Sequence, residues 1–316
     1  MKPQSLIQQL LVLSIGAVSC TAPEEGTGSV TLEIVPPAPL SRSESLPDGS
    51  DQWEEEAADC QVFIFDGSGT LEMRDAPGTE SSLTYNLTTG MKDIHVVSGC
   101  PELYPRDIRE LESVILELGN TRGKSLPMTG HLPVAVARDE PASHTVALKR
   151  CVSRITITAM RNSLLSGLDI ETSFVFLRAG RTRIDLPLTG MVPDSGLQNT
   201  DYGQFTDFPD CVATSDLVGA RTGAIPCGKG SSSVPASLYT FPGAGLEEAD
   251  FPSLVVATGV RGEWFFGEIP LGELRANTAY TVEVDIRDTG PALTGDLCAD
   301  GFVTGWKSGA SYTENM

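Results

Sequence analysis

The three histidines, His95, His131 and His144, are the side chains of this chain best suited to acid–base or metal chemistry. We find none of them beside a cysteine or a carboxylate at the spacing typical of metal ligands. The sequence contains no nucleophile elbow, zinc-protease helix motif or phosphate-binding glycine loop. With 42 acidic residues in 316, no carboxylate pair stands out as catalytic. The sequence therefore predicts a non-enzymatic protein with no cofactor, no metal site and no small-molecule substrate.

Cys20 is the residue whose neighbours indicate a chemical modification. A positive charge at Lys2, an apolar stretch from Leu6 to Ala17 and small residues just before Cys20 predict a signal peptide over residues 1–19. The apolar stretch is too short to span a bilayer, which needs about 20 residues. Residues 17–20, AVSC, resemble a bacterial lipobox, in which the cysteine is lipidated on sulfur and becomes the acylated amino terminus. The alternative is an ordinary signal peptide whose boundary lies near a cysteine.

Six further cysteines are available for disulfides if the chain is exported, because exported thiols can oxidise. They are Cys60, Cys100, Cys151, Cys211, Cys227 and Cys298. A domain boundary near residue 165 would leave three on each side, so either one thiol per half is free or one bridge crosses the boundary. We predict a disulfide between Cys211 and Cys227, which bracket a short segment with glycines and a proline. The alternative is six buried thiols that pack as small hydrophobic side chains.

The charge balance excludes one large class of partner. The chain has 22 basic and 42 acidic residues, a formal net charge of −20. Nucleic-acid binding draws on clustered lysine and arginine facing phosphates, so we expect no nucleic-acid partner. Strong acidity instead indicates a soluble, self-repelling surface.

Alternation of apolar and polar residues predicts many short β-strands. Residues 29–35 form the first, with Val30, Leu32 and Ile34 on one face. Two runs, 60–65 and 70–73, flank an Asp-Gly turn and predict a hairpin rather than a calcium loop. Further strands are predicted over residues 83–87, 92–98, 131–137, 144–148, 151–159, 170–178, 182–188, 237–241, 253–260, 263–269 and 280–286.

One helix is predicted, over residues 105–118, where apolar residues recur at spacings of three and four. Many short strands without intervening helices are typical of antiparallel sandwiches, and the chain length fits two of them. We predict a tether with the first strand over residues 20–57, an N-terminal β-sandwich domain over 58–165 and a C-terminal β-sandwich domain over 166–316. The C-terminal domain carries a cysteine-bearing insertion after Pro193 and a C-terminal tail.

Several short motifs, in their order along the chain, resemble the FimB/Mfa2 family of fimbrial subunits in Bacteroidetes. They are the lipobox at Cys20, VFIFDGSGTL from Val62, LPMTG from Leu126, LKRCVSRI from Leu148 and NTAYTV from Asn277. The resemblance covers residues 20 to about 290. Cys151, where a small residue is usual, and the insertion after Pro193 depart from the family pattern.

This resemblance implies an all-β fold of two transthyretin-like antiparallel β-sandwich domains. It also implies a location at the cell outer membrane, through lipid on Cys20, and a role as anchor or minor subunit of a surface fimbrium. The implied partners are fimbrial stalk or accessory subunits. Two alternatives are a fimbrial tip adhesin and a surface glycan-binding lipoprotein, the latter requiring an exposed cluster of aromatic residues on one face.

Family subunits assemble by strand exchange, in which a groove left by a lost N-terminal strand is filled by an extended strand of another subunit. Here the corresponding strand, Val30 to Val35, is tied to the lipid, so we expect the chain to keep it and to act as donor or terminator. The candidate contact is the tail from Leu297 to Met316. Phe302, Thr304 and Trp306 would share one face of an extended strand there. The alternative is a frayed terminus.

Overall fold

The structure is a computed structural model that describes residues 26–37, 57–118, 126–165, 167–170, 172–178, 180–181, 183–186, 236–242, 251–261, 263–288, 290–295 and 307–311. Across these residues the regular structure is almost entirely β-strand, which confirms the all-β class predicted from the sequence. No helix in the described part of the chain has the length and apolar character needed to cross a membrane.

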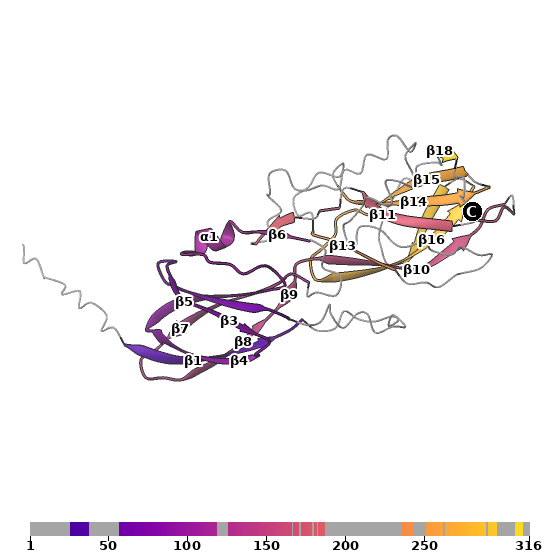
Figure 1. The fold of residues 1–316 in the computed structure, drawn as a ribbon. Helices are drawn as coiled ribbons and strands as arrows, with labels where there is room; N and C mark the ends of the chain where they lie inside the picture. Colours follow the sequence, from indigo (N-terminus) through magenta and orange to yellow (C-terminus); the bar gives the residue numbers. More distant parts are fainter. Residues whose placement is uncertain are drawn as a thin grey trace, which may run out of the picture.

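The first half of the fold contains two facing sheets (Figure 1). The smaller sheet has the strand order β4-β1-β8 and the larger has the order β3-β2-β5-β7-β9. Their bounds are β1 Thr27–Val35, β2 Cys60–Asp66, β3 Leu71–Gly78, β4 Ser82–Thr88, β5 Gly90–Ser98, β7 Met128–Val136, β8 Ala142–Ala147 and β9 Lys149–Arg150.

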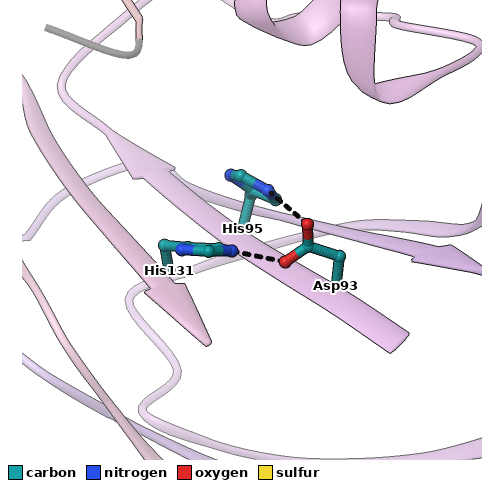
Figure 2. A group of neighbouring side chains, drawn as sticks. All are labelled: Asp93, His95 and His131. Atoms are coloured by element: carbon teal, nitrogen blue, oxygen red, sulfur yellow. Dashed lines mark hydrogen bonds and ion pairs between the residues drawn. The ribbon is translucent and has the colours of Figure 1, made fainter. Parts of the chain in front are cut away.

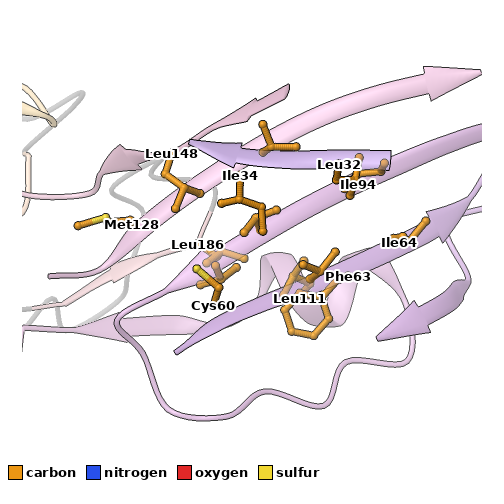
Figure 3. Packing of buried hydrophobic residues seen from close by; sticks show 14 of the residues in the cluster. Leu32, Ile34, Cys60, Phe63, Ile64, Ile94, Leu111, Met128, Leu148 and Leu186 are labelled. Carbon is orange, nitrogen blue, oxygen red and sulfur yellow. The ribbon is translucent and has the colours of Figure 1, made fainter. Parts of the chain in front are cut away.

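The hydrophobic core of this half lies between the two sheets (Figure 3). Leu32 and Ile34 of β1 project toward Ile94 of β5, and all three are at most 3% exposed. Burying an aliphatic side chain stabilises the fold by about 1.5–3 kcal/mol, so these residues hold the two sheets together. Phe63 and Phe65 of β2 are fully buried on the other face of the larger sheet, the face that also carries His95.

The predicted hairpin between β2 and β3 is confirmed, and Asp66 holds its turn. The Asp66 carboxylate accepts hydrogen bonds from the backbone N–H groups of Ser68, at 2.8 Å, and Thr70, at 3.0 Å. The Ser68 hydroxyl donates to the same oxygen at 2.6 Å. This is the side-chain-to-backbone bonding by which aspartate favours turns.

The second half again contains two sheets, with the orders β13-β10-β16-β17 and β11-β14-β15-β18. Their bounds are β10 Ser153–Asn162, β11 Thr172–Arg178, β13 Ala236–Thr240, β14 Ser253–Val260, β15 Glu263–Pro270, β16 Thr278–Arg287, β17 Gly290–Gly295 and β18 Lys307–Ser311. Ile155, Val256 and Val284 are each fully buried in a second hydrophobic cluster.

The two halves repeat one topology. In the first half, β1 pairs antiparallel with β4 and parallel with β8. In the second half, β10 pairs antiparallel with β13 and parallel with β16. The facing sheets also correspond, because β2-β5-β7-β9 and β11-β14-β15-β18 have all their pairs antiparallel. Each half therefore places its first strand in the interior of a sheet, between an antiparallel and a parallel neighbour.

The helix predicted over residues 105–118 is wrong in length. The observed helix α1 spans Ile108–Glu112, with Asp107 as its N-cap, and it is followed by strand β6, Ile115–Glu117. Strand β6 pairs with β12, Arg183–Asp185, in a two-stranded sheet. The pairing of Leu116 with Ile184 takes the second part of the predicted helix into a sheet, a long-range contact that local spacing does not reveal.

Asn277 joins the two halves through its backbone and its side chain. Its N–H donates to the Val152 carbonyl at 2.9 Å, and its side-chain oxygen accepts from the Arg150 N–H at 3.2 Å. Its φ of 53° lies in the left-handed region, which asparagine tolerates better than most residues. Within the second half, the Ser153 hydroxyl at the start of β10 donates to the Arg275 carbonyl at 2.9 Å.

Two glycines with the same backbone conformation provide a test of the close packing at the end of β5. Gly99 has φ of +68°, and a Cβ there would lie 2.3 Å from the Leu126 carbonyl oxygen. Gly78 has φ of +67°, and a Cβ there would meet no atom within 4 Å. We expect Gly78→Ala to lower the free energy of unfolding by about 1–2 kcal/mol, the cost of the left-handed conformation. Gly99→Ala should cost about 1–3 kcal/mol more because backbone must move. Urea unfolding of both variants measures the difference, and equal losses would contradict the described packing.

Candidate functional site

Strand β1 is held in its sheet by a neighbouring strand on each side (Figure 1). It is separated in sequence from every other described strand, yet it lies inside its sheet with a neighbour on each side. Val30 faces Tyr85 of β4 and Ala142 of β8, and the register continues along the strand on both sides. Without β1, both β4 and β8 would each lose a hydrogen-bonded neighbour, and two unpaired edges would face one another across a groove.

The two faces of β1 differ as the sequence predicts. Val30, Leu32 and Ile34 are 1%, 0% and 3% exposed. On the other face Thr31 donates or accepts a 3.0 Å hydrogen bond with Thr84 of the neighbouring strand, and Glu33 is exposed. Backbone groups thus hold the strand along its length, and alternate apolar side chains fill the core beneath it.

Backbone hydrogen bonds at both ends of β1 hold the strand in addition to its pairing with β4 and β8. At the start, the Thr89 N–H donates to the Gly26 carbonyl at 2.8 Å. At the end, the Leu148 N–H donates to the Val35 carbonyl at 2.8 Å. Near the start, the backbone of Gly28 also lies close to that of Ala137, because a Cβ at Gly28 would lie 2.3 Å from the Ala137 carbonyl oxygen. The strand is therefore held at both ends as well as along both edges.

The site residues predicted from the sequence lie outside the described residues. They are Cys20, Cys211, Cys227, Phe302, Thr304 and Trp306. Immediately after them, β18 of the predicted tail pairs antiparallel with β15, with Phe266 opposite Lys307. This part of the tail is an added strand at the edge of a sheet.

Three cysteines of the described residues are free thiols: Cys60, Cys100 and Cys151. Burial raises the pKa of Cys100 to about 11 and that of Cys151 to about 12. A thiol with a raised pKa holds little thiolate at neutral pH and is a poor nucleophile. These three side chains therefore pack as small hydrophobic groups, which was the alternative to disulfide formation.

A cluster of two histidines and an aspartate, which the sequence reasoning missed, lies on the larger sheet of the first half (Figure 2). His95 of β5 is directly opposite His131 of β7, and their rings stack with centroids 4.5 Å apart. The Asp93 carboxylate lies 3.6 Å from Nε2 of His95 and forms a hydrogen bond with His131. The available signal was Asp93 two residues before His95 in a predicted strand, which places both on one face.

The buried member of this cluster is neutral at neutral pH. Burial lowers the pKa of His95, and the nearby His131 lowers it further, while the Asp93 and Glu112 carboxylates act in the opposite direction. Among the described residues, Nε2 of His95 is buried without a hydrogen-bond partner. Phe65 packs its ring edge-on against the His95 imidazole, with the centroids 5.8 Å apart. The arrangement places two imidazole rings and one carboxylate together on the face of the sheet.

Comparison with known proteins identifies the fold. No protein-family model matches the chain, and no curated protein matches it either. A solved candidate cell adhesion protein from Parabacteroides distasonis is similar, with a TM-score of 0.56 at 13% identity over 92% of this chain and 99% of that one. Another, from Bacteroides eggerthii, has a TM-score of 0.55 at 15% identity over 91% of this chain and 96% of that one. A fimbrilin from Porphyromonas gingivalis has a TM-score of 0.55 at 12% identity, covering 91% and 98%.

These similarities extend over nearly the full length of each solved chain. At identities of 15% or less they establish a shared fold. The predicted resemblance to fimbrial subunits is therefore confirmed at the level of fold. The assignment of each sandwich as transthyretin-like stays a prediction.

The attachment of β1 can be tested by comparing its two faces. Leu32→Ala removes a fully buried side chain and should lower the free energy of unfolding by about 2–5 kcal/mol. Glu33→Ala, the next residue on the exposed face, should change it by about 0.5 kcal/mol or less. Urea denaturation of the full chain measures both. Similar small effects at the two positions would contradict the burial of β1 in the core.

Proposed function

We propose that this chain is a non-enzymatic fimbrial subunit, tethered by lipid to the outer membrane and assembled with its partners by strand exchange. The observation that carries the proposal is the interior position of β1, a strand distant in sequence that completes a sheet between β4 and β8. The fold shared with a solved fimbrilin and with candidate adhesion proteins supports it.

Strand β1 has the properties that a donor strand needs in such an assembly. Its backbone forms ladders on both edges, which provides affinity, and Val30, Leu32 and Ile34 occupy the core in alternation, which provides specificity. A subunit that loses this strand exposes a groove for another chain. A subunit that keeps it has its first sandwich complete. We propose that this chain keeps β1 and so closes one end of a fimbrium.

The proposed lipid on Cys20 explains why the strand is kept. Only residues 21–26 separate Cys20 from Thr27, where β1 begins. Even fully extended, this connection spans at most about 25 Å, so lipidation would hold the start of β1 close to the membrane surface. A cut after the strand, for example beyond Arg42, would release the rest of the protein from the membrane. An anchor that is cut there would fail in its role.

With its N-terminal strand occupied, the chain must meet its partner elsewhere, and we propose the tail from Leu297 to Met316. Strand β18 within this tail pairs only with β15 among the described strands, and it lies at the end of its sheet order. An edge strand presents unpaired backbone groups to an incoming chain. Phe302, Thr304 and Trp306 are the proposed contact residues just before it.

The alternatives gain less support from the described residues. Glycan binding predicts exposed aromatic residues gathered on one face. Among the described residues, the exposed large hydrophobic side chains include one aromatic, Tyr104, and it stacks against the Arg74 guanidinium at 4.2 Å. A tip adhesin would share the fold but has no need of a permanent membrane tether.

Recovery of the chain from the native cell surface under non-reducing conditions tests the proposed assembly. We expect a fimbrial stalk or accessory subunit to co-purify with it. Trp306→Ala should reduce the recovered partner severalfold, whereas Val303→Ala, which alternation in the sequence predicts on the opposite face, should not. Recovery of the chain without any pilus subunit, or equal recovery with both variants, would contradict the proposed partner contact.

A further inference from the structure

We propose that Asp93, His95 and His131 form a binding site for a divalent transition-metal ion, for which zinc is the best match. The three ligand atoms, one from each side chain, all lie within 4.8 Å of one another. Figure 2 shows both imidazole rings directed at the one carboxylate. Two imidazole nitrogens and one carboxylate oxygen are a common set of protein ligands for zinc, which leaves a further coordination position open.

The distances suit a tetrahedral ion. Zinc binds histidine nitrogen and carboxylate oxygen at about 2.0–2.2 Å, so neighbouring ligand atoms of a tetrahedral site lie about 3.4 Å apart. The Nε2 of His95 and the Oδ2 of Asp93 are 3.6 Å apart, which is too long for a hydrogen bond but close to this spacing. The His131 ring stacks on the His95 ring, and the ligand atom that it offers lies within 4.8 Å of those of His95 and Asp93.

The cluster also has the electrostatic features of a cation site. The buried Nε2 of His95 has no hydrogen-bond partner among the described residues, so an ion would supply its missing interaction. The carboxylate of Asp93 provides one negative charge, and Glu112, the last residue of α1, provides a second one nearby. Coordination of the metal ion would replace the hydrogen bond between His131 and Asp93. A proton carried by Nε2 of His131 would then pass to solvent.

The backbone positions of the three ligands are fixed, while access stays open. β5 and β7 are interior strands of the five-stranded sheet, and Phe65 packs against the His95 ring. The side chain of His131 is 55% exposed and that of Asp93 is 32% exposed, so an ion can enter from solvent. The open position would therefore be filled by water or by a carboxylate of a neighbouring surface. This distinguishes the site from a closed structural zinc site, in which four protein ligands surround the ion.

The ligand set predicts selectivity. Nitrogen ligands suit zinc, nickel and copper, whereas magnesium and calcium require sites made of oxygen. We therefore expect zinc to bind and magnesium and calcium to have no measurable effect at the same concentrations.

Calorimetric titration of the full chain, without a histidine tag, tests the proposal with zinc chloride as the probe. We expect one zinc ion per chain at this site. His131→Gln and Asp93→Asn should each weaken its binding at least about tenfold. His144→Gln is the matched control, because His144 lies on β8 in the other sheet, and it should leave binding unchanged.

Two further measurements make the outcome decisive. Thermal melts followed by circular dichroism without metal should show that the variants fold. If His131→Gln does not fold, the zinc affinity of Asp93→Asn alone tests the site. Visible absorption of the cobalt-substituted chain should show a tetrahedral spectrum that is lost in Asp93→Asn and kept in His144→Gln. Absence of zinc binding, or zinc binding that both cluster variants retain unchanged, would overturn the proposal.

Discussion

The pairing of β1 with both β4 and β8 is the interaction on which the first half of the structure depends. It joins two strands that would otherwise be separate edges, and it inserts three buried side chains, Val30, Leu32 and Ile34, into the core between the sheets. Folded domains are stable by only about 5–15 kcal/mol, so a strand that contributes several buried aliphatic side chains is a large share of that stability. Whether β1 stays attached to its own chain therefore decides whether the first half of the fold is complete or open.

The second half of the chain contains a strand in the same position as β1. In the second half β10 occupies the place that β1 occupies in the first, between an antiparallel and a parallel neighbour. There, however, the strand follows the first half directly and is connected to it through Arg150, Val152 and Asn277. The strand that can be exchanged without breaking the connection between the halves is β1. This difference is why we place the function of the chain at its N-terminal strand and leave the partner contact to the tail.

Local alternation was sufficient to predict most strands, because a half-buried strand must place apolar residues at every second position. Residues 29–35 were predicted with the correct buried face, and residues 253–260 with the observed bounds. The helix prediction failed at Leu116, whose partner Ile184 is far away in sequence. The His95–His131 pair was missed for the same reason, since it exists only through the register of β5 with β7. Long-range pairing, parallel pairing above all, is the part of the fold that a single sequence did not disclose.

We propose that the chain keeps β1 because its N-terminus is fixed to lipid. Intact mass and N-terminal analysis of the protein isolated from cell membranes test it most directly. We expect a blocked chain that begins at Cys20, carries the added mass of its acyl groups and includes Thr27–Val35. A mature chain that begins beyond Arg42 would contradict it, because β1 would then have been removed and its groove opened for another subunit.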